Sequence, residues 1–502
     1  MKRKAIIPLL TSAMIISSTT SLVNAHEIEI ESVKKYPVNI SDDIRVKYNG
    51  VNSELFNNGF KTGFGSAITF KGFNENNEPE FYALTDRGPN GESPEYKIGD
   101  ETYPSKFFPT PSFTPSVGLL TLKSDEAYIS SSIELKDKSG KNVSGLPLEP
   151  EKMGSTGEVA LDMDLNVIGY DNEGIDTEGI ARDKDGNIWT CDEYGPFLMK
   201  FDSSGKMLEK YAPGDGLADV LKYRIPNRGF EGLTITPSGK VLVAVQSVLD
   251  IEGETKKTSL FTRIIEFDPK TKESKMYAYP VEVSDYNAPQ DCKIGDICAV
   301  DDNTLLVIEQ GKDKDKNMQN YVYKVDLSDA TDITNVKYEG KELEYVEDKN
   351  LIKDINFAQK ELVVDLRANG WTTEKAEGIT LLPDNKTIVV INDNDFELAM
   401  NATDENNEKV AISDYTYDSQ TKEFIKENNA SNINITLNKN SEDSEIWTIK
   451  LKDEIKGYTT EESESSVKDS SSKNNNLIYV GMASIAALGA SLYIFKKKRK
   501  SN

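Results

Sequence analysis

The chain has 502 residues, of which 37% are hydrophobic and 28% charged, so it is long enough for one large repeat domain or for two to three ordinary domains. Its formal net charge of −25 argues against a nucleic-acid binder, because such proteins normally carry the opposite sign. Two interpretations of the acidity remain: it keeps an exported protein soluble, or some of the carboxylates collect cations.

The single histidine and the three cysteines narrow the chemistry further. His26 lies at the expected mature N-terminus, which argues strongly against a Ser-His-Asp triad, a histidine nucleophile or a His-ligated metal centre. The sequence has no CxxC motif and no His/Cys cluster, so a zinc site of the usual ligand set is not expected. Cys292 and Cys298 are near enough in sequence to pair in an oxidising compartment, which would leave Cys191 unpaired.

Both ends of the chain predict export and membrane anchoring. Residues 1–25 combine basic, apolar and small-residue stretches in the order of a signal peptide. Residues 477–495 contain no charge and are long enough to cross a bilayer as a transmembrane helix, and the basic tail 496–502 predicts a cytoplasmic C-terminus. The Ser-, Glu- and Asn-rich stretch 456–476 is expected to be a disordered stalk. These features predict a single-pass protein with its body at the cell surface.

The segment 26–55 is a weakly patterned lead-in, with a strand that could help to close a ring. The body, residues 56–455, contains a strand–turn–strand unit that recurs near residues 66, 178, 231, 296 and 377. In the copy at 178, Asp185-Gly186 suits the tight turn of a hairpin. Small antiparallel sheets repeated in this way predict an all-β protein of the β-propeller type. The segment near residue 116 resembles a further sheet, so the count favours six blades and leaves five or seven open.

Three of these units begin with the same acidic residue. Glu178, Glu231 and Glu377 each open a strand and are each followed by glycine, whereas Ser66 and Asp296 stand at the matching point of two other copies. The first strand of a propeller blade lies nearest the axis, so these glutamates are expected to form a ring of carboxylates. Such a ring is stable only if it is protonated or bridged by cations, and oxygen ligands suit Ca²⁺ or Mg²⁺. The alternative is that the Glu-Gly pair caps backbone amides and locks neighbouring blades together.

Five segments in order, FYALTDRGP, DTEGIARDKDGNIWTCDEYGPFLMKFD, NRGFEGL, DICAVDDNTLLVIEQG and EGITLLPDNKTIVVINDNDF, resemble the phytase-like family, whose bacterial members are described as having the esterase-like activity of phytase. The resemblance runs from about Gly63 to Phe396. It implies a propeller with a carboxylate-rich site that hydrolyses phosphoesters. The metal ligands that we expect on this basis are Asp86, Glu178, Glu231, Glu309, Glu377 and Asp393. The expected catalytic residues are Glu178, Asp192, Glu193, Glu231, Arg87 and Arg228. Asp395 accompanies Asp393 among the matching acidic residues, and Gln246 and Arg263 are weaker correspondences.

Simpler roles compete with these at two places. Asp192 and Glu193 could form a solvated strand end, and Asp86-Arg87-Gly88 could form an internal salt bridge beside a turn instead of a phosphate site.

Three functions are therefore open. The first is a Ca²⁺- or Mg²⁺-dependent hydrolase in which a metal-activated water attacks a phosphorylated small molecule or another ester. The second is a Ca²⁺-dependent propeller of the lactonase or esterase type. The third is a non-catalytic surface module in which the Glu-Gly pairs serve only to pack the blades. No nucleic-acid partner is expected, and the membrane is expected to be contacted through the C-terminal anchor.

Overall fold

The computed structural model describes residues 28–56, 58–282 and 284–458. The expected signal peptide, transmembrane helix and basic tail lie outside these residues, as does the expected stalk from residue 459 onward. Within the described ranges, no helix has the length and apolarity that a bilayer span requires. The helices there are short 3-10 turns: η1 (Asp42–Ile44), η2 (Ser53–Leu55), η3 (Asp219–Tyr223), η4 (Ile251–Gly253), η5 (Pro289–Asp291), η6 (Leu343–Tyr345), η7 (Lys349–Ile352), η8 (Asp395–Glu397) and η9 (Ile412–Asp414).

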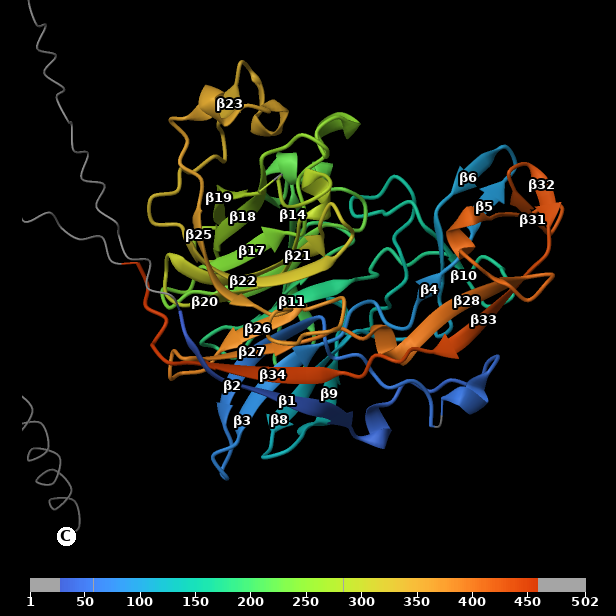
Figure 1. Cartoon of the computed structure of the whole chain (residues 1–502), viewed down its shortest axis with the longest axis horizontal. Helices are drawn as coiled ribbons and strands as arrows, with labels where there is room; N and C mark the ends of the chain where they lie inside the picture. The colour runs from blue at the N-terminus through green and yellow to red at the C-terminus, as the bar shows by residue number, and fades with distance from the viewer. Residues whose placement is uncertain (1–27, 57, 283, 459–502) are drawn as a thin grey trace, which may run out of the picture. The chain divides into compact units, whose positions relative to one another are not determined.

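Most of the chain forms five antiparallel blades arranged around an axis (Figure 1). Blade 1 contains β2 (Ala67–Phe73), β3 (Pro79–Leu84), β8 (Ser116–Leu122) and β9 (Ala127–Glu134). Blade 2 contains β11 (Thr177–Arg182), β12 (Ile188–Asp192), β13 (Phe197–Phe201), β14 (Met207–Pro213) and the short β15 (Gly216–Leu217). Blade 3 contains β16 (Phe230–Ile235), β17 (Val241–Val245), β18 (Phe261–Asp268) and β19 (Glu273–Pro280). Blade 4 contains β20 (Lys293–Ala299), β21 (Thr304–Lys312), β22 (Met318–Asp326) and β25 (Gln359–Asp365). Blade 5 contains β26 (Gly378–Leu381), β27 (Thr387–Ile391), β34 (Glu445–Leu451) and β1 (Ile30–Ile40).

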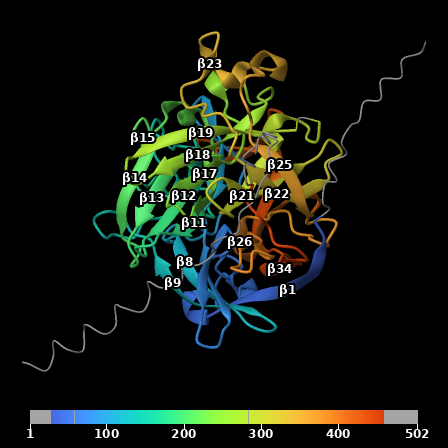
Figure 2. The same cartoon turned by 90° about the vertical axis from the view of Figure 1, so that its left-hand side faces the viewer.

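The innermost strands close the ring. Strand β2 packs on β11, β11 on β16, β16 on β20, β20 on β26, and β26 again on β2. In Figure 2, β11 and β26 lie near the middle of the ring, whereas β14 and β1 lie at its periphery. The prediction of six blades is therefore wrong. The segment near residue 116 is the β8–β9 hairpin, which supplies the two outer strands of blade 1, because the loop after β3 delays their appearance in the sequence.

Strand β1 joins the first and last blades. It pairs antiparallel with β34, from Ile30 opposite Leu451 to Pro37 opposite Glu445, and its last residues pair in parallel with β9, with Val38 opposite Ala127. Blades 5 and 1 therefore form one continuous eight-stranded sheet. Hydrogen bonds across this seam replace the unpaired strand edges that an open ring would expose.

Successive side chains of a strand point to opposite faces of its blade, so each pair of neighbouring blades has its own apolar interface. In β17, Val241 and Val243 pack toward blade 2 beside Trp189, whereas Leu242 and Ala244 pack toward blade 4. Because both faces of such a strand are buried, β17 is a continuous apolar run and not an alternating one. The other three interfaces contain their own clusters, around Phe201, Phe81 and Trp447.

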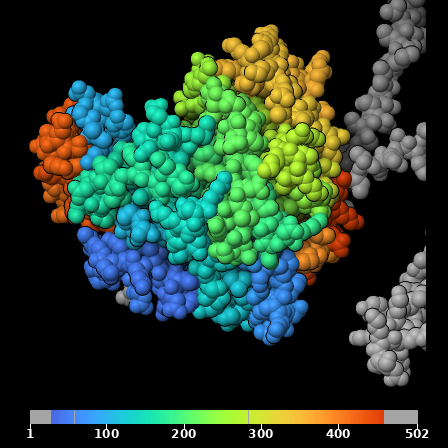
Figure 3. Space-filling model, turned by 180° about the vertical axis from the view of Figure 1, so that it is seen from behind, coloured from blue at the N-terminus to red at the C-terminus, as the bar shows by residue number. Residues whose placement is uncertain are grey.

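Two long loops, 83–115 and 395–440, carry strands of their own and form a lobe beside the ring together with a strand at Val159–Leu161. Strand β30 pairs in parallel with β5, with Tyr417 opposite Tyr96, so segments more than 300 residues apart share one sheet. Figure 3 shows these blue and orange-red segments side by side at the left edge. The strands of the lobe are β4 (Gly91–Glu92), β5 (Glu95–Ile98), β6 (Glu101–Tyr103), β7 (Ser105–Phe107), β10 (Val159–Leu161), β28 (Leu398–Asp404), β29 (Lys409–Val410), β30 (Thr416–Asp418), β31 (Glu423–Lys426), β32 (Asn429–Ser431) and β33 (Ile433–Lys439).

One further excursion, between β22 and β25, carries the hairpin β23 (Lys337–Tyr338) and β24 (Lys341–Glu342). It is held to blade 3 by a buried ion pair in which Arg263 Nε donates to Glu344 Oε1 at 2.7 Å and Arg263 Nη2 donates to Glu344 Oε2 at 2.9 Å. All three cysteines are free, so Cys292 and Cys298 do not pair.

Candidate metal centre

Glu178, Glu231 and Glu377 converge at the axis of the ring. They come from β11, from β16 and from the residue before β26, and each offers a carboxylate oxygen within 4.8 Å of the other two. All three side chains are buried. Glu178 and Glu231 lie at irregularities in the strand register, which turn the side chain out of the usual alternation toward the axis.

The glycine after each glutamate is required by the approach of the next blade. A Cβ on Gly179 would lie 2.7 Å from the backbone nitrogen of Leu233, and a Cβ on Gly232 would lie 2.7 Å from Asp296 Cα. Gly232 also has a φ of +86°, which other residues rarely adopt. The two residues of the pair thus differ in role: the glycine allows the close approach of the next blade, and the glutamate lies in a carboxylate group at the axis.

A second carboxylate group shares Glu178 with the first. Asp86, Asp176 and Glu178 also offer oxygens within 4.8 Å of one another. Asp86 follows β3 of blade 1, and Asp176 immediately precedes β11 of blade 2. The sequence analysis missed Asp176, although it lies two residues before a repeated Glu-Gly pair.

Arg87 joins this second group as a structural partner. Its backbone N–H donates to Asp176 Oδ1 at 3.0 Å, and its side chain lies 3.5 Å from Asp176 Oδ2 and 3.2 Å from Glu158 Oε2. Arg87, in the turn Asp86-Arg87-Gly88, therefore makes internal salt bridges at the edge of the carboxylate group. Asp86 Oδ1 accepts the Gly88 N–H at 2.7 Å, which fixes its orientation.

Glu193 lies beside Glu231, and the two share a donor. Gln246 Nε2 donates to Glu193 Oε1 at 2.7 Å and to Glu231 Oε2 at 2.9 Å. Asn227 Nδ2 donates to the other oxygen of Glu193 at 2.8 Å. Asp192 is fully buried, and its Oδ1 accepts the Tyr194 N–H at 2.8 Å, so neither residue is a solvated strand end.

On the opposite side, Lys375 neutralises part of the centre. Its Nζ lies 2.7 Å from Asp393 Oδ2, 2.9 Å from Asp395 Oδ1 and 3.7 Å from Glu377 Oε2. Burial alone would lower the pKa of this lysine, but the carboxylates of Asp393, Asp395 and Glu377 raise it well above its ordinary value. The sequence analysis missed Lys375, which precedes Glu377 by two residues.

Two expected members lie elsewhere. Glu309 belongs to neither carboxylate group, because its oxygens accept from Tyr279 at 2.6 Å, Tyr286 at 2.9 Å and Lys360 at 2.7 Å. Asp296 does not stand where the other blades carry Glu: it packs against Gly232, and its Oδ2 accepts the Ile379 N–H of blade 5 at 2.8 Å. Asp296 is therefore the carboxylate that links neighbouring blades through a backbone amide.

Several buried oxygens of the centre accept no hydrogen bond within the part of the chain that the structure describes. They are Ser66 Oγ, Asp176 Oδ2, Glu178 Oε2, Asp192 Oδ2 and Gln246 Oε1. A buried polar atom without a partner costs about 1–3 kcal/mol, so a group of them points to a ligand. Because the donor set consists of oxygen atoms, mostly from carboxylates, it fits a hard divalent cation such as Ca²⁺ or Mg²⁺.

Burial and mutual repulsion raise the pKa of these carboxyl groups. Desolvation is the largest cause for each, and neighbouring carboxylates add to it. The pKa of Glu377 rises to about 8 and that of Glu193 to about 7. The pKa values of Glu178 and Glu231 are raised well above the ordinary value, with Glu231 acting on Glu178 and Glu193 on Glu231.

These shifts predict how the stability of the metal-free protein depends on pH. An unfolded glutamate loses its proton near pH 4.5, whereas Glu377 keeps its proton up to a pKa of about 8 in the folded state. The folded state therefore binds more protons between these values, and its stability falls as the pH rises from about 4.5 to 8. With chelator present, the melting temperature should decline across this range. With Ca²⁺ in excess the decline should be smaller, because cations bind the ionised carboxylates. Parallel curves with and without Ca²⁺ would contradict the prediction.

A cavity of about 200 Å³ adjoins the centre and carries a slight excess of positive charge. Its charged lining consists of the basic side chains Arg228, Lys293, Lys312 and Lys375 and the acidic side chains Asp291, Glu374 and Glu377. Arg228 is held there by a hydrogen bond from its Nη1 to the Gln290 carbonyl oxygen at 2.6 Å, which leaves its other donors free for a ligand. The basic side chains of this cavity offset part of the negative charge of the glutamates at the axis.

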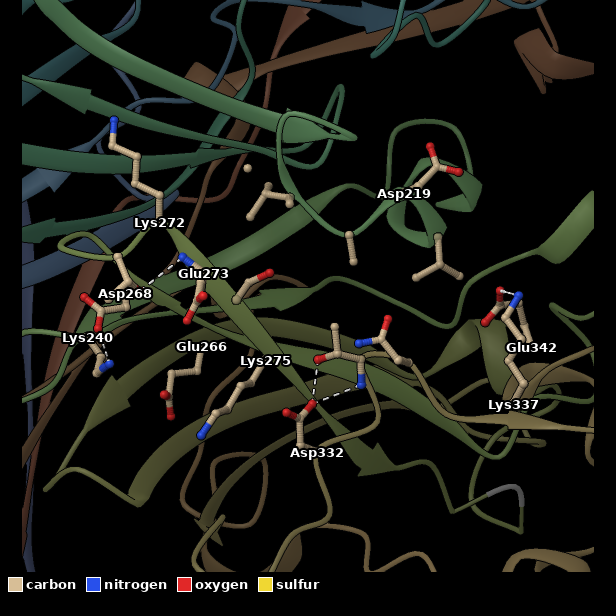
Figure 4. A pocket seen from close by; sticks show the side chains of 18 of the residues that line it. Asp219, Lys240, Glu266, Asp268, Lys272, Glu273, Lys275, Asp332, Lys337 and Glu342 are labelled. Carbon is tan, nitrogen blue, oxygen red and sulfur yellow. Dashed lines mark hydrogen bonds and ion pairs between the residues drawn. The ribbon is translucent and has the colours of Figure 1, made fainter.

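A larger hollow, of about 1050 Å³, lies between the outer strands of blades 2 and 3 and the excursion after β22 (Figure 4). Two ion pairs join charged residues of its lining, Lys240–Asp268 at 2.5 Å and Lys337–Glu342 at 2.9 Å. None of the site residues expected from the sequence lines it. The carboxylate groups lie at the axis instead.

Comparison with known families agrees with the motifs. The model of the phytase-like family, described as "esterase-like activity of phytase", matches residues 62–396, about two-thirds of the 502-residue chain. The chain belongs to the phytase-like family. The matched range includes all five blades' inner strands and the whole carboxylate centre, from Asp86 to Asp393 of this phytase-like protein.

A curated relative is 34% identical over 122 residues: an uncharacterized secreted protein of Arthroderma benhamiae. The match covers 19% of this phytase-like chain and 24% of the relative, so it spans about a quarter of the relative's length. Among solved structures, a putative oxidoreductase (glucose dehydrogenase) of Thermus thermophilus is 10% identical, with a TM-score of 0.28 over 81% of this chain and 100% of that one. Virginiamycin B lyase of Staphylococcus aureus is 9% identical, with a TM-score of 0.27 over 84% of this chain and 100% of that one. No conclusion about function rests on likenesses this low.

Proposed function

We propose that this protein is an exported hydrolase of phosphoric esters whose activity depends on a divalent cation held at the propeller axis. The observation that carries the proposal is the convergence of Glu178, Glu231 and Glu377 with Asp86 and Asp176, with buried oxygens that have no partner. Membership of the phytase-like family supports the reaction class. The secreted relative and the expected signal peptide support export, and the C-terminal segment supports an anchor in the membrane.

The nucleophile in this proposal is water. The described cysteines Cys191 and Cys292 are buried, and burial raises the pKa of each thiol well above its usual range, so neither supplies a thiolate. A bound divalent cation would lower the pKa of a water molecule and polarise the phosphoryl oxygen.

The chain's own residues then have distinct roles. Glu193 is held by Asn227 and Gln246 at the edge of the centre, and burial raises its pKa to about 7, which suits a general base near neutral pH. Arg228, Lys293 and Lys375 face the adjoining cavity and would hold the phosphoryl charge. Arg87 acts indirectly, because its side chain is engaged with Asp176 and Glu158 and so orients the carboxylates.

The basic side chains of the cavity favour phosphoric esters over neutral lactones. A lactone or carboxylic ester has no anionic group to match Arg228 and Lys293. The purified body should therefore release p-nitrophenol from p-nitrophenyl phosphate or from bis-p-nitrophenyl phosphate with Ca²⁺ or Mg²⁺, and lose this activity with chelator. Turnover confined to lactones or p-nitrophenyl acetate would support the lactonase alternative. No turnover of any panel member, with cation bound, would favour a binding module.

Substitution of Lys293, one of the lysines that line the cavity, tests whether the cavity binds the substrate. Lys293 makes no ion pair within the described ranges, so its charge is available to a ligand. We expect Lys293→Gln to raise the KM for a phosphoric ester about tenfold, which corresponds to about 1.4 kcal/mol, with a smaller change in kcat. Lys312→Gln is the matched control, because Lys312 lines the same cavity but is already paired with Glu374 at 3.2 Å. Equal effects of the two substitutions would contradict a specific role for Lys293.

A further inference from the structure

The carboxylate centre consists of two overlapping groups and not of one ring. Glu178, Glu231 and Glu377 form the first group, and Asp86, Asp176 and Glu178 form the second. In each group the ligand oxygens lie within 4.8 Å of one another. Ligands of a Ca²⁺ or Mg²⁺ ion, at about 2.0–2.6 Å from it, can be up to about 5 Å apart, so each group has the size of one coordination sphere.

We propose that this centre holds two divalent cations, bridged by the carboxylate of Glu178. Glu231 and Glu377, from blades 3 and 5, hold the first cation. Asp86 and Asp176, from blades 1 and 2, hold the second. The inference deepens the proposed function, because it concerns the same centre, but it makes a claim about cation number and ligands that can be tested without turnover.

The environment of Glu178 is the first independent support. Within the described residues no hydrogen bond or ion pair reaches its carboxylate, and its Oε2 is buried without a partner. The other members each have a protein partner: Gly88 N–H at Asp86, Arg87 at Asp176, Gln246 at Glu231 and Lys375 at Glu377. The carboxylate that both groups share is therefore the one that no donor or cation of the described residues contacts, which leaves its oxygens available to a bridging role.

Ser66 is the second support. It stands at the start of the inner strand of blade 1, where blades 2, 3 and 5 carry a glutamate, and its Oγ is also buried without a hydrogen-bond partner. The serine side chain is smaller than a glutamate side chain. It therefore leaves space that an ion or an ordered water can occupy. Asp86, two residues beyond β3 of the same blade, supplies the acidic ligand that Ser66 does not.

The charge at the centre favours more than one cation. The buried carboxylates Asp86, Asp176, Glu178, Glu193, Glu231, Glu377 and Asp393 outnumber the basic side chains Arg87, Lys293 and Lys375 that act on them. If these groups are ionised, a single divalent cation leaves negative charge uncompensated in a buried site, where it is costly.

Cation stoichiometry tests the proposal on the intact body. Calorimetric titration with Ca²⁺ and with Mn²⁺ should give two equivalents for the wild type. Asp86→Asn and Glu377→Gln should each remove one equivalent, and the double variant should remove both. Glu178→Gln alone should weaken both sites so far that neither is filled at the cation concentrations that saturate the wild type. Asp313→Asn is the control, because Asp313 lies in an exposed turn rich in acidic residues and should leave both equivalents unchanged.

A spectroscopic measurement avoids dependence on the variants. Two Mn²⁺ ions that share a carboxylate are close enough for their spins to couple, so the electron paramagnetic resonance spectrum of the loaded wild type should show a coupled pair. A single equivalent, two uncoupled ions, or loss of the same ion in Asp86→Asn and Glu377→Gln would overturn the inference. If the wild type binds one cation and hydrolyses phosphoric esters, the inference fails and the proposed function stands. If it binds a coupled pair and hydrolyses no phosphoric ester, the proposed function fails.

Discussion

Glu178→Gln is expected to reduce hydrolysis of a phosphoric ester by roughly a hundredfold or more, because a bound cation contributes several kcal/mol to the stabilisation of the transition state. The same substitution should also abolish the thermal response to cations. A cation that binds only the folded wild type stabilises it by about 2.7 kcal/mol when its free concentration is a hundred times Kd. Chelator should therefore lower the melting temperature of the wild type, and Ca²⁺ should restore it.

In Glu178→Gln, the melting temperature with chelator should be at or above that of the wild type. The amide removes one charge from a crowded group in which burial and then Glu231 raise the pKa of Glu178. A stable but inactive variant that no longer responds to Ca²⁺ would separate the role of Glu178 in binding from a role in blade packing. Glu266→Gln, on an outer strand where Glu266 accepts from Tyr277, is the matched control and should change neither activity nor the response. If Glu178→Gln unfolds the protein, or if activity survives, the centre is a packing device.

Arg263→Met should destabilise the protein by about 3–5 kcal/mol, which is the usual cost of leaving one buried charge without its partner. Arg263 and Glu344 are 1% and 0% exposed and make two parallel hydrogen bonds. Because Glu344 lies in the excursion after β22, this pair fixes that excursion to blade 3. Urea unfolding of the wild type and the variant would measure the difference.

The double variant Arg263→Met, Glu344→Leu should recover most of the lost stability, because no buried charge then remains. Specific activity at a temperature where each variant is folded should stay near that of the wild type, since neither residue belongs to the carboxylate groups. A large fall in kcat with an unchanged melting temperature would instead make Arg263 part of the site, as its weak correspondence to the family motifs suggested.

The local sequence was sufficient to predict the repeating unit and its first residue. Hairpins punctuated by Asp-Gly turns, and the recurrence of Glu-Gly at strand starts, identified the inner strands β11, β16 and β26 before their positions were known. Radial symmetry then brings equivalent positions to the axis, which is why Glu178, Glu231 and Glu377 could be expected to converge.

The number of blades depends on which strands pair with one another, and the spacing of the strands along the sequence does not reveal that pairing. Residues 91–107 of the lobe interrupt blade 1 between β3 and β8, and residues 398–439 interrupt blade 5 between β27 and β34. Such insertions move the outer strands away from the inner ones along the chain. The β8–β9 hairpin therefore resembled a separate blade, although it is part of the first.

The sequence by itself determined which residues open the inner strands of blades 2, 3 and 5, because a hairpin and its Glu-Gly start are set by neighbours in the chain. Only the tertiary structure decided which carboxylates act together, because that depends on distances between blades. Asp176 and Lys375 enter the centre from positions just outside the repeat, whereas Glu309 leaves it for Tyr279, Tyr286 and Lys360. Asp296 lies one step along the strand from the repeated glutamates and bonds a backbone amide of blade 5 instead of facing the channel. The physical reason is the same in each case. The charges and hydrogen-bond donors around a carboxylate decide whether it can bind a cation or only packs the blades, and those groups come from other blades.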